Sequence, residues 1–281
     1  MHKIDGRARV AFQGEPGAFS QLAARKLLGE GVATVACPTF EALFDSITHG
    51  RADLILAPLE NTLAGPVLRC YDLLYQSRLR MSGEVVLRIS HCVIGVPGAK
   101  LDEVRRIQSH PVALAQCERF FATHSQIAKS VAEDTAGSVR QVMEQRDPSV
   151  AAIASSFAAE EYGAEVLVES VEDDASNFTR FALLEPEGVV AERDEEADAC
   201  TLVLTVANRP GALFHSLEPF AANDVDLMSL VSRPLVGAPW HYRFFLEVAA
   251  AASDPRMQKA LSELEPRAVE LRVLGSYRSG K

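Results

Sequence analysis

Residues 9–29 of this chain, RVAFQGEPGAFSQLAARKLLG, set the structural pattern from which the fold class follows. RVAFQG predicts a buried first strand, and GEPG predicts a turn. AFSQLAARKLLG predicts a helix that ends at Gly29, because apolar residues recur at helical spacing from Phe19 to Leu27. The chain is therefore expected to begin with a strand, a tight turn and a helix.

The same alternation continues downstream. ATVACP (33–38) predicts a second strand, TFEALFDSITHG a second helix with Thr39 as its N-cap, and ADLILAPLEN (52–61) a third strand. Strands that alternate with helices through short connections are typical of a parallel sheet covered by helices. Ligands bind such sheets beyond the carboxyl ends of the strands. The loops GEPGAFS, PLENTLAG and SNFTRF (176–181) are therefore the expected lining of a site.

A second set of strands and helices follows GEVVLRISHCVIGVPG (83–98), a β-rich stretch predicted to cross between two lobes. In each of the segments 105–121, 127–144 and 149–163, a strand ends at hydroxyl or amide residues and a helix begins. A helix N-terminus carries roughly half a positive charge. These segments therefore predict a site that binds an anion.

The C-terminal part of the sequence differs from the preceding part in composition and in the predicted order of its elements. Residues 185–198 are acidic and lack aromatic side chains, which predicts a linker. Residues 199–277 predict the order strand, helix, strand, strand, helix, strand, which is a ferredoxin-like βαββαβ unit. In its first helix we expect one apolar stripe, made of Leu213, Phe214, Leu217, Phe220 and Ala221.

Composition excludes several classes of function. The 281 residues carry 28 Lys and Arg against 38 Asp and Glu, a net charge of −10, which argues against a nucleic-acid partner. The first ten residues hold no apolar signal region, and we find no apolar run long enough to span a membrane. The five cysteines form no metal-ligand spacing, which indicates reduced thiols, a cytoplasmic location and no metal site. Nucleotide-binding and serine-hydrolase motifs are also absent from the sequence.

Several polar residues leave more than one interpretation open. Glu60 and Asn61 are suited to moving a proton and to hydrogen bonding, or they form a polar turn before Gly65. SNFTRF either ends a strand with an Arg180 that extends to solvent, or it places a hydroxyl and a cation at a site. Ser109 is expected to cap the next helix, with Gln116 on the same side two turns later.

Two further side chains are expected to be inert. A nucleophilic pair of Cys117 and His110 is disfavoured, because Cys117 is predicted to lie mid-helix on an apolar face. His91 lies in a β-rich run and is expected to be a buried, hydrogen-bonded histidine rather than a base.

Taken together, these segments resemble the prephenate dehydratase family. The resemblance covers about residues 8 to 277 and rests on GEPGAFSQLAA, PLENTLAGPV, SHPVALAQC, EDTAGSV, AAIASSFAAEEYG and NFTRF, in that order, followed by NRPGALFHSL and VSRP. It implies a two-lobed α/β catalytic domain like type II periplasmic binding proteins, followed by a regulatory ACT domain. The expected bounds are 8–184 for the catalytic domain (lobe 1 about 8–88 and 171–184, lobe 2 about 89–170) and 199–277 for the ACT domain.

The resemblance also implies a reaction and the residues that carry it. Prephenate would lose CO2 and water to give phenylpyruvate, a carbon–oxygen lyase step in L-phenylalanine biosynthesis that needs no cofactor. The Thr of the family's TRF motif, its key catalytic residue, corresponds to Thr179. The other expected catalytic residues are Glu60, Asn61, Ser109 and Gln116. The expected substrate-binding residues are Arg180, Phe181, Thr62, Ser20, Thr135 and Ser155.

The second domain is expected, by the same resemblance, to bind L-phenylalanine as a feedback inhibitor in a homodimer or a dimer of dimers. The matching residues are Asn208, Pro210, Gly211, Ala212, Leu213, Ser232 and Arg233. Val231 stands where the family usually has Glu, which leaves the strength and sign of this control open.

Three alternatives stay open at this point. A solute-binding protein would share the lobes but predicts a signal peptide, and an inactive ACT-containing sensor would not need Thr179, Glu60 and Asn61. Arogenate dehydratase would perform the same chemistry on the corresponding amino acid. We see no fused chorismate mutase helices before residue 8, so a single activity is expected.

Overall fold

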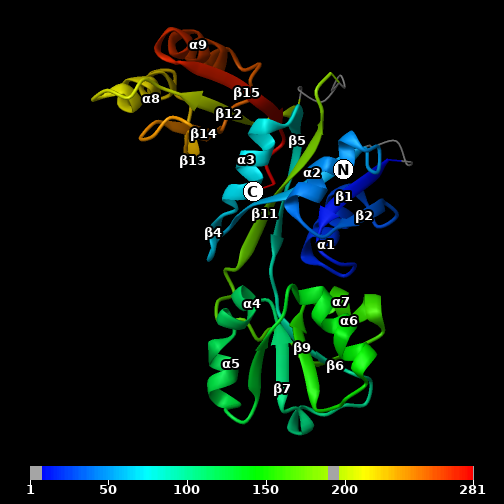
Figure 1. Cartoon of the computed structure of the whole chain (residues 1–281). Helices are drawn as coiled ribbons and strands as arrows, with labels where there is room; N and C mark the ends of the chain where they lie inside the picture. Colours follow the sequence, from blue (N-terminus) through cyan, green and yellow to red (C-terminus); the bar gives the residue numbers. More distant parts are fainter. Residues whose placement is uncertain (1–7, 189–195, 281) are drawn as a thin grey trace. The chain divides into compact units, whose positions relative to one another are not determined.

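The structure, a computed structural model, describes residues 8–188 and 196–280. The described residues form two compact units. The first comprises those up to Gly65 together with Val86–Phe181, and the second comprises Pro66–Val85 together with those from Ala182 onward. Part of the expected linker 185–198 lies outside the described residues, and the domain bounds given above stay a prediction. Figure 1 shows the elements in chain order.

The first sheet has the strand order β2-β1-β3-β11-β5, with β4 paired to β3. Strand β1 runs parallel to both β2 and β3. The helices α1 and α2 connect these strands in the expected order, and Thr39 Oγ1 accepts a hydrogen bond from Ala42 N at 3.1 Å as the predicted N-cap. The bounds are β1 Arg9–Gln13, α1 Phe19–Leu28, β2 Ala33–Cys37, α2 Phe40–Thr48, β3 Leu54–Asn61, β4 Gly65–Pro66, β5 Leu79–Arg88 and β11 Phe178–Pro186.

The second sheet has the strand order β10-β6-β9-β7-β8 and is mixed. Strand β7 runs parallel to β8 and β9, whereas β6 runs antiparallel to β9 and β10. Figure 1 shows α4 and α5 on one side of this sheet and α6 and α7 on the other. The bounds are β6 Cys92–Gly95, β7 Arg106–Ser109, α4 Pro111–Ala115, α5 Glu118–Thr123, β8 Ala128–Val131, α6 Thr135–Gln145, β9 Val150–Ala154, α7 Ser156–Tyr162 and β10 Glu165–Val168.

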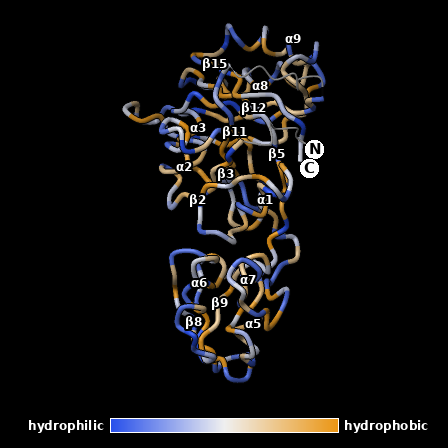
Figure 2. Tube along the Cα trace, turned by 90° about the vertical axis from the view of Figure 1, so that its right-hand side faces the viewer, coloured by the Kyte–Doolittle hydropathy of each residue, from blue (hydrophilic) through white to orange (hydrophobic). Residues whose placement is uncertain are grey.

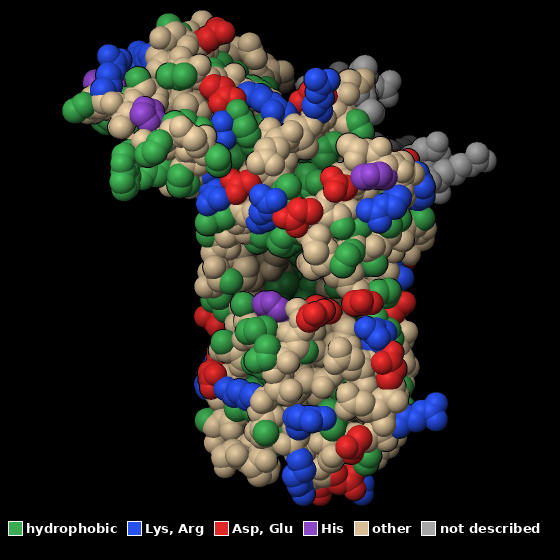
Figure 3. All heavy atoms as spheres, in the orientation of Figure 1, with side chains coloured by type: hydrophobic (Ala, Val, Ile, Leu, Met, Phe, Trp, Pro, Cys, Tyr) green, Lys and Arg blue, Asp and Glu red, His purple; other side chains and the backbone are tan. Residues whose placement is uncertain are grey.

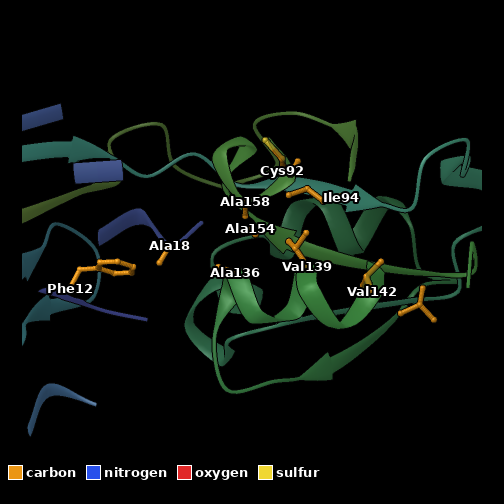
Figure 4. Packing of buried hydrophobic residues seen from close by; sticks show 12 residues of the cluster. Phe12, Ala18, Cys92, Ile94, Ala136, Val139, Val142, Ala154 and Ala158 are labelled. Carbon is orange, nitrogen blue, oxygen red and sulfur yellow. The ribbon is translucent and has the colours of Figure 1, made fainter. Parts of the chain in front are cut away.

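Strand alternation divides the core of this lobe into two layers. Cys92, Ala152 and Ala154 face α6 and α7, where Val139 and Ala158 are buried. Their neighbours Val93, Ala151 and Ile153 face α4 and α5 instead. Phe12 and Ala18, which precede α1, join the first layer, so the core continues between the two sheets (Figure 4). Figure 2 shows the hydrophobic residues along these strands and hydrophilic residues at the loops.

The predicted helix over residues 111–121 is wrong in one respect, because two short helices replace it. Pro111 begins α4, and His110 rather than Ser109 is the N-cap, with its Nδ1 accepting from Val112 N at 3.3 Å. Cys117 lies between the helices as the N-cap of α5, not mid-helix. The break has a physical cause: the Asp173 carboxylate accepts hydrogen bonds from Glu118 N at 2.8 Å and Arg119 N at 2.9 Å and starts a new helix.

The second unit contains the predicted βαββαβ order. Its antiparallel sheet has the strand order β13-β14-β12-β15. The helix α3, Leu68–Gln76, packs on this sheet, with the Tyr71 ring centroid 5.0 Å from that of Phe245. The bounds are β12 Ala199–Thr205, α8 Ala212–Ala222, β13 Leu227–Pro234, β14 Tyr242–Val248, α9 Pro255–Leu264 and β15 Glu270–Tyr277.

The predicted apolar stripe of α8 is only partly right. Phe220 is buried, but Phe214 is 70% exposed and Ala221 lies on the exposed side. The helix instead buries Ser216, Pro219 and Phe220, which repeat at the spacing of one helical face. Figure 3 shows hydrophobic side chains gathered at the end of this unit that carries α8. Trp240, which lines a cavity together with Leu213 of α8, is 79% exposed.

Among residues 8–188 and 196–280, no helix has the length and apolar character needed to cross a membrane.

Candidate active site

The carboxyl end of β3 meets the start of β11 through the side chain of Asn61. Its Oδ1 accepts hydrogen bonds from Leu63 N at 3.0 Å and Ala64 N at 2.8 Å, which closes the turn after β3. Its Nδ2 donates to the Thr179 hydroxyl at 3.0 Å and to Asn177 Oδ1 at 2.8 Å. The fold therefore brings together two of the predicted catalytic residues.

Thr62 fixes the same junction by hydrogen bonds to the backbone of β11. Its N–H donates to Phe178 O at 2.9 Å, and its hydroxyl donates to Ser176 O at 2.7 Å. The hydroxyl also accepts from Phe178 N at 2.9 Å. Because this hydroxyl already donates one hydrogen bond and accepts another, Thr62 positions the strand that carries Thr179.

Arg180 is buried at 4% exposure, so the interpretation of an arginine that extends to solvent is wrong. Its guanidinium approaches Glu60 Oε2 at 3.5 Å, while the Glu60 side chain is 41% exposed. Phe181 is buried beside it at 2%. The end of β3 and the start of β11 therefore carry a buried cation, a carboxylate open to solvent and the Thr179 hydroxyl.

Gln116 joins this region from the second lobe. Its Oε1 accepts from Asn177 Nδ2 at 3.0 Å and lies 3.0 Å from His91 Nε2. Its backbone oxygen accepts from Asp173 N at 2.7 Å. Gln116 is thus linked to Asn61 through the side chain of Asn177.

Ser109 is fully buried at the end of β7, and its hydroxyl donates to Ile153 O at 2.6 Å. That hydrogen bond joins β7 to β9 in the second sheet. The hydroxyl hydrogen of Ser109 is therefore already used in a structural contact.

The predicted helix starts are present. Ser155 accepts from Ala158 N at 3.1 Å as the N-cap of α7, and it donates to Gly17 O at 3.0 Å. Gly17 has a φ of 87°, and a Cβ there would lie 2.9 Å from Ala158 Cα. The GEPG turn therefore lies directly against the start of α7. Ser20 is buried in the first turn of α1, and Thr135 is half-buried at the first position of α6.

Asn177 is a residue of this site that the sequence did not single out, whereas His91 was expected to be a buried, hydrogen-bonded histidine and is one. Asn177 is fully buried and His91 is 2% exposed. The His91 ring packs edge-on against Phe19 with centroids 5.6 Å apart, and burial lowers its pKa, which favours the neutral ring. The available signal was an amide side chain within the SNFTRF segment, one residue from a strand that enters the core.

The structure gives no support to a nucleophilic pair of Cys117 and His110. Burial, assisted by the negative charge of Asp173, raises the pKa of the Cys117 thiol to about 12, which keeps it protonated. In the described part of the chain, no group of three or more His, Cys, Asp and Glu side chains is placed to hold a metal ion. The Thr179 hydroxyl accepts a hydrogen bond from the side-chain amide nitrogen of Asn61.

The expected effector residues divide into two places in the second unit. A cavity of about 130 Å³ is lined by Asn208, Ala212 and Leu213 from the β12–α8 connection, together with Trp240 and Tyr242. Gly211 begins α8 with a φ of 78°. Arg233 instead binds Asp72 of α3, with Nε 2.8 Å from Oδ1, and does not line this cavity.

Comparison with known proteins adds independent observations. A family model described as prephenate dehydratase matches residues 10–188. Arogenate dehydratase 2 of Petunia hybrida is 37% identical over 287 residues, covering 97% of this chain and 72% of that protein.

Two solved structures resemble nearly the whole chain. One, described as GqqA, a novel type of quorum quenching acylase, has a TM-score of 0.89 and 35% identity and covers 96% of this chain and 98% of that one. The other is prephenate dehydratase from Arthrobacter aurescens in complex with L-Phe, with a TM-score of 0.87, 30% identity and coverage of 97% and 90%. Since the family model matches more than half of the residues and the relatives exceed 30% identity along the chain, this chain belongs to the prephenate dehydratase family.

Proposed function

We propose that this chain converts prephenate to phenylpyruvate by decarboxylating dehydration. The ring carboxylate leaves as CO2, its electron pair makes the ring aromatic, and the ring hydroxyl leaves with one proton as water. The observation that carries the proposal is the contact of Asn61 Nδ2 with the Thr179 hydroxyl, on the strand that also carries the buried Arg180. These groups supply what the reaction requires without a cofactor, which is a hydrogen-bond donor for the departing oxygen and a countercharge for a carboxylate.

In this mechanism Thr179 donates a hydrogen bond, or relays a proton, to the departing hydroxyl. A threonine hydroxyl is too weak an acid to act alone, so Glu60, Asn61 and Gln116 are proposed to form the network that assists it. Arg180 opposes a substrate carboxylate, with the N-termini of α1, α6 and α7 contributing further positive potential. Ser109 contributes by holding β7 against β9 beneath this region.

Arogenate is the alternative substrate, because a relative at 37% identity is an arogenate dehydratase and the bond changes are the same. The purified protein is given equal amounts of prephenate and arogenate at neutral pH, and both products are followed by mass spectrometry. Phenylpyruvate as the main product supports the proposal, whereas phenylalanine as the main product moves the substrate to arogenate. Formation of neither product above the blank contradicts both assignments.

Because one similar structure is described as an acylase, acylase activity is measured alongside dehydratase activity. An acylase needs an activated nucleophile, and the described thiols of this chain are buried. A chromogenic fatty-acyl anilide tests this activity, with Thr179→Val protein as the matched control. Release of the anilide dye by the wild-type protein, together with no turnover of prephenate or arogenate, would replace the dehydratase proposal by an acyl-transfer one.

We further propose that residues 199–277 form an ACT domain that binds L-phenylalanine as a feedback effector. Its support is the βαββαβ order, the cavity beside Asn208 and Leu213, and the L-Phe complex of the Arthrobacter protein. Heat-unfolding curves with L-phenylalanine, and with D-phenylalanine as control, test binding, and assays with both test its effect on turnover. An unchanged melting temperature and unchanged activity contradict the regulatory proposal. Because Val231 replaces the usual Glu, the sign of the effect is read from the same assay.

The protein is also proposed to act in the cytoplasm as a homodimer or a dimer of dimers. The described cysteines are all free and buried, as is usual for a reducing compartment. Exposed apolar side chains such as Phe214 and Trp240 are available for subunit contacts. Light scattering after gel filtration measures the assembly, and a monomer at micromolar concentration contradicts it.

A further inference from the structure

The direction of the hydrogen bonds around Asn61 is set by the backbone amides of Leu63 and Ala64. A peptide N–H donates and cannot accept, so the side-chain atom that faces Leu63 N and Ala64 N must be the Asn61 oxygen. The amide nitrogen of Asn61 therefore faces Asn177 Oδ1, the Thr179 hydroxyl and the Phe178 backbone oxygen, and acts as the donor to all three. Two backbone donors fix this orientation of the Asn61 amide.

The same reasoning extends through Asn177. Its side-chain oxygen accepts from Asn61 at 2.8 Å, so its nitrogen is the atom that faces Gln116 Oε1 at 3.0 Å. Asn177 is fully buried, and water does not reach its amide to replace a lost partner. A reversed amide at this position would set oxygen against oxygen on one side and nitrogen against nitrogen on the other.

The chain of donors ends at His91. Because Gln116 Oε1 already accepts from Asn177, the contact of 3.0 Å to His91 Nε2 requires a proton on that nitrogen. His91 Nδ1 has no hydrogen-bond partner within the described residues. Burial disfavours the charged ring and lowers the pKa of His91, so the neutral form with its proton on Nε2 satisfies the geometry.

The orientation of the Asn61 amide also determines how the Thr179 hydroxyl can bond. Its oxygen accepts from Asn61 Nδ2, so its own hydrogen is not used in that contact. The hydroxyl hydrogen remains available to donate to another group. A hydroxyl that is held as an acceptor on one side is oriented as a donor on the other.

We propose that Asn177 is a positioning residue: it carries the hydrogen-bond direction that the Leu63 and Ala64 amides fix at Asn61 on to Gln116 and His91, and so holds Gln116 in the orientation that belongs with a donating Thr179 hydroxyl. The kinetic part of this inference rests on the proposed dehydratase function, whereas the direction of the hydrogen bonds from Asn61 to His91 does not.

The test determines directly which ring nitrogen of His91 carries the proton. In protein labelled with ¹⁵N-histidine, long-range ¹H–¹⁵N spectra at pH 8 distinguish a proton on Nε2 from one on Nδ1. The wild-type protein is expected to carry it on Nε2. The resonances are assigned by their loss in His91→Gln. A wild-type proton on Nδ1 overturns the inference, whatever the activity of the protein.

Two nearly isosteric variants sharpen this test. In Asn177→Asp the side chain can still accept from Asn61 but cannot donate, so the Gln116 amide turns over and the His91 proton is expected to move to Nδ1. In Gln116→Glu the carboxylate accepts from both neighbours, so the proton is expected to stay on Nε2. Asn223→Asp, in the second unit, is the matched control and is expected to leave His91 unchanged. A proton that stays on Nε2 in Asn177→Asp overturns the inference.

The kinetic arm separates positioning from general stability. Asn177→Asp is expected to lower kcat by about 100-fold with a smaller change in KM, because Gln116, a member of the proposed network, loses the donor that orients it. Unchanged kcat in that variant overturns the role of Asn177. If the wild-type protein turns over neither prephenate nor arogenate, the proposed function fails. The His91 spectra alone then test the direction of the hydrogen bonds from Asn61 to His91.

Discussion

Asn61 Nδ2 donates to the Thr179 hydroxyl at 3.0 Å, although the two residues are 118 positions apart in the sequence. The contact exists because β11 returns beside β3 in the first sheet, so the end of one strand and the start of the other share an edge. Thr62 fixes the alignment through Phe178 and Ser176. The position of Thr179 is therefore set by the sheet and by the turn after β3.

Replacing Thr179 by Val removes the hydroxyl while keeping the branched shape. Turnover is expected to fall by about 100-fold or more, because the departing oxygen loses its donor. Thr179→Ser is the matched control and should keep much of the activity. Rates of product formation, together with the melting temperature, measure both. Near-normal kcat in Thr179→Val would remove this residue from the mechanism.

Gly17→Ala should destabilise the first unit. The added Cβ would meet Ala158 Cα at 2.9 Å while the backbone has a φ of 87°. Strain and overlap together predict a loss of about 2–4 kcal/mol in the free energy of unfolding. Gly29→Ala is the control, since its φ is 103° but nothing lies within 4 Å of the added Cβ. Urea unfolding compares the two, and an equal or larger loss in Gly29→Ala contradicts the packing argument.

The Cys117 thiol should not react in the folded protein. Its pKa is raised to about 12 by burial, so it is protonated and shielded at pH 8. Ellman's reagent is expected to label Cys117 only after unfolding in guanidinium, where all five cysteines react. Peptide mapping identifies the labelled residue. Rapid labelling of Cys117 in the native state would reopen the cysteine nucleophile.

His91 should make the protein less stable in acid. Burial lowers its pKa below the ordinary value of 6.5, so below that pH the unfolded chain binds a proton that the folded chain does not. Its contribution to stability is therefore present above about pH 6.5 and is lost as the pH falls, by at most about 1.4 kcal/mol per pH unit. Urea unfolding at pH 7.5, 6 and 5 should show a flatter dependence in His91→Gln. The exposed His49, changed to Gln, is the control, and an identical slope in all three proteins contradicts the prediction.

Asp72 and Arg233 should couple α3 to β13 within the second unit. Their side chains are 25% and 23% exposed and form a two-point contact, with Arg233 Nε 2.8 Å from Asp72 Oδ1. A double-mutant cycle with Asp72→Asn and Arg233→Gln should give a coupling of about 1–3 kcal/mol in the free energy of unfolding. Additive losses would show that each side chain acts alone.

Much of the architecture follows from local sequence signals. Thr39 and Ser155 cap helices where hydroxyl residues precede apolar repeats, and Gly29 ends a helix with a left-handed φ of 103°. The βαββαβ order of the second unit follows in the same way. These features depend on periodicity and on capping by residues near in sequence, which the chain carries without its tertiary structure.

The tertiary structure decided what distant residues do to one another. Asp173 splits the helix expected around Cys117 by capping Glu118 from 55 positions away, and packing on the sheet turns Phe214 outward. Asn177 acquires its place only when Asn61 and Gln116 approach it from opposite sides. Local signals were enough to predict most of the elements and most residue types of the site, because periodicity and capping involve residues near in sequence. Only the fold decided which of those groups are buried and which way their hydrogen bonds run, because these depend on partners that the folded sheets bring within 3 Å.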